Sequence, residues 1–596
     1  MKSWILIFHF FFMGAAGFKT CYAQNSSELN SQANPNIVVI LSDDQGWGDF
    51  SIHGNTNLST PNVDKIALEG ARFENFYVQP VCSPTRAEFL TGRYHHRGGV
   101  YSTSSGGERL DLDEKTMGRV FKEAGYTTAV YGKWHNGTQY PYHPNGRGFD
   151  DFYGFASGHW GNYFDPMLEH NGKIVKGNGY LANDITDHAI DFIKDNKNGS
   201  FFLYVAFNIP HAPMQVPDKW YKKFNQKKIE FRAAPGNVEN IDFTRAALAM
   251  CENIDWNVGR IARILDTLNL SKNTILVYFN DNGPNEYRWN GGMKGKKGSV
   301  DEGGVRSPLF VKWPGKIKAG KKPEQLAGAI DLLPTLADLA QIPYTTDKEL
   351  DGISLKNFLI QDSSPMSDRV LINQWRGKIS VRSQKYRLSH DNLLYDIEND
   401  RGQKNELGNR LVKEELLKEK ENFKKQINKE DLTNSDHRPF LLGHPDTEYT
   451  HLPARDGIAH GNITRSNKFP NCSFFTNWKN VNDFISWDTQ VLESGAFEVT
   501  IYYTGTQKVL NSEYQLSLGK NSIKFRISEI FNPPLRGMEN DRVKRKNSYV
   551  KDFKPLSIGK IHLDKGKIPL VLKSLSLPEK EGIDVRLILF KRIRPN

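Results

Sequence analysis

The sequence contains few cysteines. There are four in 596 residues, and only Cys82, Cys251 and Cys472 lie beyond the first 23 residues. Three cysteines are too few for a disulfide scaffold, so at least one should be free or modified. Cys251 falls in a helical pattern of apolar residues and is interpreted as a small core residue. Long apolar runs are also missing after the N-terminus, which argues against a membrane-spanning helix.

Patterns typical of nucleic-acid-binding proteins are absent as well. The sequence has no zinc-finger spacing and no RNA-recognition motif, although its formal net charge is +11. A positive charge of this size favours acidic partners without identifying them. Basic residues gather at several places, including residues 316–322 and 542–546, and each cluster alone is read as solvated surface lysine and arginine. Nucleic acid is therefore not expected as a partner.

The first 23 residues resemble a secretory signal peptide. Lys2 is followed by an apolar run over residues 4–17 and by a small-x-small cleavage site at residues 21–23. We expect the mature chain to begin near residue 24 and to be exported, with the periplasm as the expected destination and secretion as the alternative. The run is too short to span a membrane. A lipid anchor on Cys21 fits less well, because the residues before it are not small and apolar.

An α/β domain is predicted for residues 24–345. Apolar residues make up 38% of the chain and aromatic residues 12%, enough for a large core. Short apolar runs alternate with helical patterns, such as those of residues 61–70 and 243–268, which indicates a mostly parallel sheet between helices. The predicted buried strands are residues 37–41, 127–131, 201–207 and 275–279.

Each of these four strands is followed at once by polar residues of unusual composition. Because ligands of open α/β sheets bind outside the carboxyl ends of the strands, we expect these residues to converge on one edge. They are Asp43 and Asp44, residues 132–135, residues 210–213, and residues 281–283.

Two smaller regions are predicted to follow. Residues 346–435 contain a hairpin pattern at 384–397 and a charged amphipathic helix at 411–427, which indicates a small α+β subdomain. Residues 436–596 become rich in alternating strand patterns, for which a β-sandwich is the economical interpretation. That sandwich loosely resembles carbohydrate-binding modules, but a purely structural role is the alternative.

The acidic residues at the strand ends suggest a metal site. Asp43, Asp44, Asp281 and Asn282 would together supply four hard oxygen ligands, which suit Ca²⁺ or Mg²⁺. Either pair alone is common in ordinary turns, whereas two pairs on neighbouring strands favour a metal. The lack of clustered thiolates or of three histidines argues against zinc.

A specific signature lies at residues 82–93, which read Cys-Ser-Pro-Thr-Arg-Ala-Glu-Phe-Leu-Thr-Gly-Arg. Pro84 is tolerated in the first turn of a helix, so Cys82 should lie at the positive end of a helix dipole, which favours anions. The run resembles the signature of the type I sulfatases, in which the cysteine is oxidised to formylglycine (3-oxoalanine). Residues 125–137 resemble the second signature of that family, and residues 297–304 resemble its Lys-Gly-Thr segment, with Ser299 in place of threonine.

This resemblance implies an alkaline phosphatase-like α/β fold and a set of site residues. A single calcium ion would be held by Asp43, Asp44, Asp281 and Asn282, with the modified Cys82 as a further ligand. Arg86 would position the nucleophile and balance its charge. The sulfate oxygens would be held by Lys133, His135 and Lys297, and His211 would protonate the leaving oxygen; whether His135 acts on the nucleophile instead stays open.

The resemblance also implies a mechanism. A thiol that attacked sulfur would form an adduct without an easy internal exit. In a hydrated aldehyde, one hydroxyl attacks sulfur, and after the alcohol leaves, deprotonation of the second hydroxyl regenerates the carbonyl and expels sulfate. A formylglycine-generating or anaerobic sulfatase-maturating enzyme would then be a partner during biosynthesis.

Export, the basic charge and the added β-sandwich favour a sulfated polysaccharide or oligosaccharide as the substrate, for example the algal polysaccharide ulvan. Two alternatives remain. One is a phosphoesterase of the alkaline phosphatase superfamily, against which Cys82 and the single apparent metal set count. The other is an inactive exported glycan-binding protein, against which the full set of expected catalytic residues counts.

Overall fold

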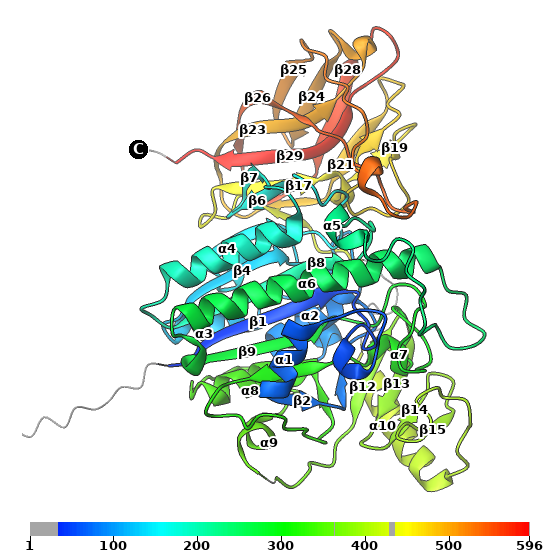
Figure 1. Cartoon of the computed structure of the whole chain (residues 1–596). Helices are drawn as coiled ribbons and strands as arrows, with labels where there is room; N and C mark the ends of the chain where they lie inside the picture. The colour runs from blue at the N-terminus through cyan, green and yellow to red at the C-terminus, as the bar shows by residue number, and fades with distance from the viewer. Residues whose placement is uncertain (1–33, 363, 428–435, 595–596) are drawn as a thin grey trace, which may run out of the picture. The chain divides into compact units, whose positions relative to one another are not determined.

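A nine-stranded sheet forms the centre of the computed structural model (Figure 1), in the order β2-β10-β9-β1-β8-β4-β5-β6-β7. The structure describes residues 34–362, 364–427 and 436–594, so the predicted signal peptide lies outside the described residues. Strands β9, β1, β8, β4 and β5 are parallel neighbours, and the other strands pair antiparallel. The strands are β1 (Asn36–Asp43), β2 (Ala71–Phe73), β4 (Thr127–Lys133), β5 (Asp151–Phe155), β6 (Met167–His170), β7 (Lys173–Lys176), β8 (Phe201–Pro210), β9 (Thr274–Asn280) and β10 (Leu309–Lys312).

The four predicted strands are confirmed as β1, β4, β8 and β9. Every residue of β1 is buried, as expected for a parallel strand covered on both faces. Because side chains alternate along a strand, Val38 and Ile40 enter one core cluster, whereas Ile37, Val39 and Leu41 enter the other. The predicted α/β fold with a mostly parallel sheet is therefore correct.

Helices cover both faces of this sheet. The first core cluster includes side chains of α1 (Pro61–Glu69), α4 (Leu181–Asp195) and α6 (Ile241–Thr267). The second includes α2 (Cys82–Thr91), α3 (Met117–Glu123) and α8 (Leu332–Leu339). Among the described residues, no helix has both the length and the apolar character needed to cross a membrane. The short helices are α5 (Asp218–Tyr221), α7 (Glu302–Val305) and α9 (Lys356–Ile360), and β3 (Phe76–Tyr77) pairs with β11 (Ala327–Gly328).

A four-stranded antiparallel sheet follows, formed by β12 (Leu371–Trp375), β13 (Lys378–Arg382), β14 (Tyr386–Leu388) and β15 (Leu394–Asp396). The predicted hairpin is confirmed as β14 and β15, and the predicted amphipathic helix is α10 (Arg410–Gln426), which packs its apolar face on this sheet. The β12–β13 hairpin was not predicted, and it contributes to the site described below.

The C-terminal part is a β-sandwich, as predicted. Two antiparallel sheets bury a common core that contains side chains such as Ile501 and Phe590 from one sheet and Leu516 and Leu572 from the other. One sheet contains β17 (Tyr449–Pro453), β19 (Thr464–Arg465), β20 (Phe475–Thr476), β23 (Gly495–Thr504), β26 (Lys554–Leu563) and β29 (Asp584–Arg592). The other contains β18 (Ile458–His460), β21 (Phe484–Trp487), β24 (Glu513–Leu518), β25 (Asn521–Arg526) and β28 (Leu570–Ser576), and a small third sheet contains β16 (Phe440–Leu442), β22 (Thr489–Val491) and β27 (Gly566–Lys567).

A buried ionic network joins the α/β part to the four-stranded sheet. Glu302 on α7 accepts hydrogen bonds from Arg306 (2.9 Å) and Tyr77 (2.6 Å), and its other oxygen pairs with Arg387 on β14 at 3.1 Å. Burial alone would raise the pKa of Glu302, but Arg387 and Arg306 outweigh it and lower the pKa to about 2.

We expect Glu302→Gln to lower the free energy of unfolding by about 3 kcal/mol, because two buried guanidinium groups would lose their counter-charge. Since the pKa of Glu302 is lowered on folding, its contribution is present above pH 4.5 and is lost as the pH falls towards 2. Urea denaturation at several pH values checks both points, with Glu414→Gln as the control, because Glu414 pairs with Arg410 on the exposed face of α10. Equal unfolding energies for the two variants would contradict the assigned role of Glu302.

Candidate active site

The carboxyl ends of β9, β1, β8 and β4 meet at one edge, because these strands are parallel neighbours. Asp43 ends β1 and Lys133 ends β4, while His211 follows β8 and Asp281 follows β9. Polar contacts join these strand ends directly, so the predicted convergence is confirmed.

Four buried side chains at this edge present oxygen atoms to one another. The backbone N–H of Asp44 donates to Asp281 Oδ1 at 3.1 Å, and the side-chain amide of Asn282 donates to Asp44 Oδ1 at 2.8 Å. Oxygens of Asp43 and Asp281 also lie within 4.8 Å of the Cys82 sulfur. The sequence-predicted metal ligands are therefore assembled in one place.

Each of three predicted ligands keeps one buried oxygen without a hydrogen-bond donor: Asp43 Oδ1, Asp44 Oδ2 and Asn282 Oδ1. An unsatisfied buried polar atom costs about 1–3 kcal/mol, so three together point to a bound group that would satisfy them. Carboxylate and amide oxygens suit a hard divalent cation such as Ca²⁺. The residues present thus fit the calcium ion that the sequence implies.

Three cations balance the three carboxylates: Arg86 and Lys133 are buried, and Lys297 is partly exposed. Lys133 Nζ lies 2.7 Å from Asp43 Oδ2, Arg86 Nη2 lies 2.8 Å from Asp281 Oδ2, and Lys297 Nζ donates to Asp44 Oδ1. Burial would raise the pKa of Asp44, but Lys297 and the other cations hold it well below the usual range. At Asp281, burial and the neighbouring Asp43 raise the pKa to about 6 despite Arg86.

Helix α2 connects the signature to the strand ends. All ten of its residues are buried, so its polar side chains need partners inside the protein. Ser83 Oγ donates to the carbonyl of His135 at 3.0 Å, and Thr85 Oγ1 donates to the carbonyl of Asp281 at 2.6 Å. Arg86 also donates to the carbonyl of Lys133 at 2.8 Å. These bonds explain why small hydroxyl residues, Ser83 and Thr85, lie close to Cys82 in the signature: their side chains hold the start of α2 against the strand ends.

Cys82 begins α2, as predicted, and its side chain is buried against the oxygen cluster. Burial raises the pKa of the thiol, and Asp43 and Asp281 add to this rise, whereas Lys133 and Lys297 oppose it. The thiolate is the nucleophilic form of cysteine, and this environment disfavours it. An unmodified Cys82 is therefore a poor nucleophile at neutral pH.

Two histidines, His135 and His211, lie at the same edge of the sheet as Cys82 and the carboxylates. His211 Nε2 lies 3.6 Å from Asp44 Oδ2, and burial, with Lys297 and Lys133, lowers its pKa to about 3 although Asp44 acts in the opposite direction. His135 has one ring nitrogen 2.9 Å from the Thr103 carbonyl, and burial lowers its pKa well below the usual value. Both imidazoles are therefore neutral at pH 7 unless a bound anion raises their pKa.

Unusual backbone conformations set the directions of these groups. Asp44 has φ +63° and His135 has φ +69°, values that non-glycine residues rarely adopt and that concentrate at functional sites. A Cβ at Gly158 would lie 2.1 Å from the His135 ring, so a larger residue there would displace the imidazole. The sequence pattern alone carries no sign of these conformations.

A cavity of about 470 Å³ opens above the cluster, within the usual range for ligand pockets. Four predicted site residues line it, namely Cys82, His135, His211 and Lys297, while Arg86, Lys133 and the predicted metal ligands lie beneath. Most residues of the cavity wall were not predicted from the sequence, although the cluster of basic residues at 542–546 was visible there. The missed lining residues include Thr103, His159, Glu286, Trp375, Arg376, Phe469, Asn471 and residues 543–547.

Comparison with known proteins supports one family. The profile described as Sulfatase matches residues 35–342, and the profile described as N-sulphoglucosamine sulphohydrolase, C-terminal, matches residues 295–431. N-acetylgalactosamine-6-sulfatase of Mus musculus is 33% identical over 380 residues, which is 58% of this chain and 69% of that protein. Arylsulfatase J of the same species is 32% identical over 343 residues, 54% of this chain and 55% of that protein.

A solved structure agrees with the sequence relatives. The crystal structure of Ps i-CgsB in complex with k-i-k-neocarrahexaose is 30% identical, with a TM-score of 0.61, and the match covers 68% of this chain and 95% of that one. The profile match spans more than half of this chain and contains every predicted site residue. The chain therefore belongs to the sulfatase family of sulfuric ester hydrolases.

Proposed function

We propose that this protein is an exported sulfatase that acts on a sulfated polysaccharide or oligosaccharide, such as ulvan, with formylglycine at position 82 and one bound calcium ion. The observation that carries the proposal is the position of Cys82, at the N-terminus of α2 and on the wall of a 470 Å³ cavity. Beneath it lie three carboxylates with Arg86 and Lys133, and Lys297 pairs with Asp44 from the cavity wall.

Asp43, Asp44, Asp281 and Asn282 would hold the ion, with the residue at position 82 as a further ligand. When bound, calcium lowers the pKa of a coordinated hydroxyl and offsets the negative charge of the approaching substrate. The three carboxylates and the three cations already balance, so a divalent ion gives the cluster a net charge of +2. Such a charge favours the sulfate group over a neutral ligand.

The chain's own residues can then carry the reaction. With formylglycine at position 82, one hydroxyl of the hydrated aldehyde would give its proton to solvent and attack sulfur, and the bond from sulfur to the alcohol oxygen would break. His211, protonated once the bound sulfate raises its pKa, would give a proton to that oxygen, while Lys133, His135 and Lys297 would hold the nonbridging sulfate oxygens. The second hydroxyl of residue 82 would then give its proton to solvent, and as the carbonyl re-forms, the C–O bond to sulfate would break and sulfate would leave. Arg86, paired with Asp281, keeps the start of α2 in position.

A carbohydrate substrate is supported by the relatives. One sequence relative is named for a sulfate on N-acetylgalactosamine, and a solved relative binds k-i-k-neocarrahexaose. The export predicted for residues 1–23 implies a substrate outside the cytoplasm, and a maturation enzyme would convert Cys82 during biosynthesis. We also propose the division into residues 24–345, 346–435 and 436–596.

Turnover of matched sulfate and phosphate esters tests this proposal. The purified full-length protein, produced with a formylglycine-generating enzyme, is offered 4-nitrophenyl sulfate, 4-nitrophenyl phosphate and sulfated fragments of carrageenan, ulvan, fucoidan and glycosaminoglycans. We expect sulfate release to exceed phosphate release at least about 100-fold, because the site is built around a single metal set and a formylglycine. Dominant phosphatase activity would favour the phosphoesterase alternative, and no release from any ester would favour an inactive glycan-binding protein.

A further inference from the structure

The β-sandwich region forms part of the active-site wall. The segment of residues 536–550 packs on the loops that follow β5 and β8: Gln215 Nε2 donates to the Gly537 carbonyl at 2.7 Å and to Asp541 Oδ1 at 3.0 Å. Arg545 pairs with Asp541 and donates to the carbonyl of Gly161. The segment is therefore held in place by buried polar contacts to the α/β part.

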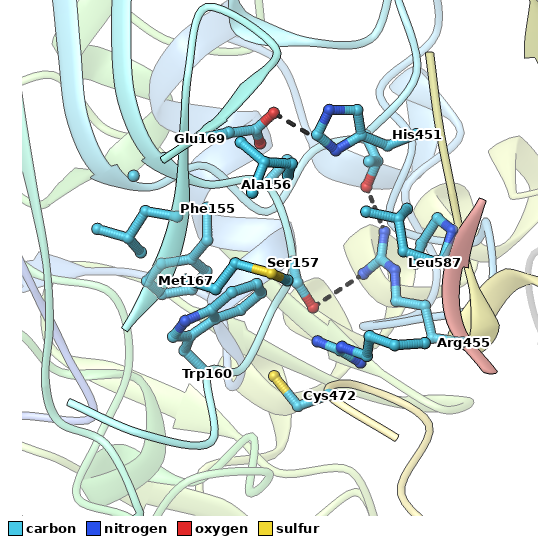
Figure 2. A pocket seen from close by; sticks show the side chains of 16 residues that line it. Phe155, Ala156, Ser157, Trp160, Met167, Glu169, His451, Arg455, Cys472 and Leu587 are labelled. Atoms are coloured by element: carbon cyan, nitrogen blue, oxygen red, sulfur yellow. Dashed lines mark hydrogen bonds and ion pairs between the residues drawn. The ribbon is translucent and has the colours of Figure 1, made fainter. Parts of the chain in front are cut away.

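A second set of contacts also holds the β-sandwich region against the α/β part (Figure 2). Arg455 Nη1 lies 3.2 Å from Ser157 Oγ, and His451 lies 3.8 Å from Glu169 on β6. The Cys472 sulfur lies 2.9 Å from the carbonyl of His159, whose side chain lines the active-site cavity. Since these contacts are buried, the sandwich is positioned firmly enough to contribute residues to substrate binding.

Three exposed cations stand on the cavity wall, and we call Arg376, Lys544 and Lys546 the basic rim. Within the described part of the chain, neither Arg376 nor Lys544 has a carboxylate partner. Lys546 lies 3.9 Å from Glu286, which is already paired with Lys296 at 2.5 Å. The rim therefore carries more positive charge than its neighbours neutralise.

Arg376 occupies a position that is unfavourable for arginine. It is the first residue of the two-residue turn between β12 and β13, with φ +47°, and Gly377 follows with φ +77°. Asparagine, aspartate and glycine are favoured at such positions. The guanidinium lies over the ring of Trp375, 5.5 Å from its centre. An arginine in a strained turn conformation on the wall of a ligand cavity suggests a role in binding.

We infer that the basic rim binds a second anionic group of the substrate, a sulfate or a carboxylate on the same glycan chain, while Cys82 receives the ester that is cleaved. The inference rests on the proposed function. The sulfate at Cys82 already has Lys133 and Lys297 close by, so the rim charges are available for another anion. Phe469 on the same wall is 45% exposed and offers apolar surface to sugar rings.

Two of the three rim residues lie outside the segments that the family profiles match. The match to Ps i-CgsB covers 95% of that chain but only 68% of this one, and the two family profiles end at residues 342 and 431. Lys544 and Lys546 lie beyond both of these ends. The β-sandwich thus adds specificity residues to a cavity whose floor lies within the residues that the sulfatase profile matches.

A double variant tests the rim. Lys544→Ala/Lys546→Ala is compared with wild type on 4-nitrophenyl sulfate, which carries one anionic group, and on two oligosaccharides with a second anion, one disulfated and one with a sulfate and a uronate. We expect KM for the oligosaccharide whose second anion fits the rim to rise about tenfold more than KM for the aryl sulfate. The matched control is Lys524→Ala/Lys573→Ala, because these exposed lysines lie on β25 and β28 and do not line the cavity.

Equal changes in KM for all three substrates would overturn the inference, as would a control variant that behaves like the rim variant. Calorimetric binding of the same oligosaccharides to Cys82→Ala protein, with and without the rim substitutions, needs no turnover. If wild type hydrolyses no sulfate ester but the rim substitutions still weaken oligosaccharide binding tenfold, the inference about the basic rim is supported and the proposed sulfatase function is wrong. If the rim substitutions leave oligosaccharide binding unchanged, the inference about the basic rim is wrong, whether or not the wild type hydrolyses sulfate esters.

Discussion

Replacement of Cys82 by alanine is expected to reduce sulfate release by about 10⁴-fold or more, the loss typical of removing a covalent nucleophile. The expected size follows from the surroundings of the residue. Cys82 is placed within 4.8 Å of the oxygens of Asp43 and Asp281, and no other cysteine lines the cavity among the described residues. Steady-state turnover of the sulfated substrate identified in the ester panel provides the measurement.

The matched control is Cys251→Ala, which makes the same chemical change inside α6, in the core and away from the cavity. Its activity per folded molecule should equal that of wild type. Wild-type protein made without a maturation enzyme should melt at the normal temperature and yet be nearly inactive, because burial keeps the thiol protonated. Mass analysis of the peptide around position 82 then relates activity to the aldehyde fraction. Turnover by Cys82→Ala, or by protein that contains only the thiol, would contradict the assigned nucleophile.

The residues at the carboxyl ends of the strands, which form the floor of the cavity, could be predicted because they follow strands with a strong apolar pattern. The runs that became β1, β8 and β9 are strongly apolar and that of β4 is largely so, and a parallel sheet brings their carboxyl ends together without any further information. The choice of Lys297 over Lys294 and Lys296 needed the family resemblance. In the structure Lys297 contacts Asp44, whereas Lys296 contacts Glu286.

The cavity wall could not be predicted in the same way. Arg376 lies at the tip of a hairpin whose first strand, β12, has no clear alternation, and Lys544 comes from a segment more than 400 residues away from Cys82. Their position depends on buried contacts such as Gln215 with Gly537, which involve ordinary polar residues in irregular loops. Local periodicity carries no information about such pairings. The basic residues at 542–546 were visible in the sequence, but the surface of the α/β part that their segment contacts was not.

The second large effect is expected from the metal site. Asp44→Asn should abolish the response to calcium and reduce activity by about 10³-fold, because the ion would lose a charged ligand and Lys297 would lose its counter-charge. For wild type, calcium at 100 times its Kd should stabilise the fold by about 2.7 kcal/mol, since it binds only the folded state. Differential scanning calorimetry with calcium and with a chelator measures this without any turnover.

Asp255→Asn is the matched control for that experiment. Asp255 is also a buried carboxylate, and it accepts hydrogen bonds from the backbone N–H groups of Asn62 and Val63 at the start of α1, away from the oxygen cluster. Its substitution should lower the melting temperature with and without calcium by the same amount, so the calcium-induced shift persists. The orphan oxygens of Asp43, Asp44 and Asn282 distinguish the two sites, because a purely structural carboxylate has its hydrogen bonds satisfied within the protein. A calcium shift of wild-type size in Asp44→Asn would show that the ion binds elsewhere, and full activity after chelation would remove the metal from the proposed chemistry.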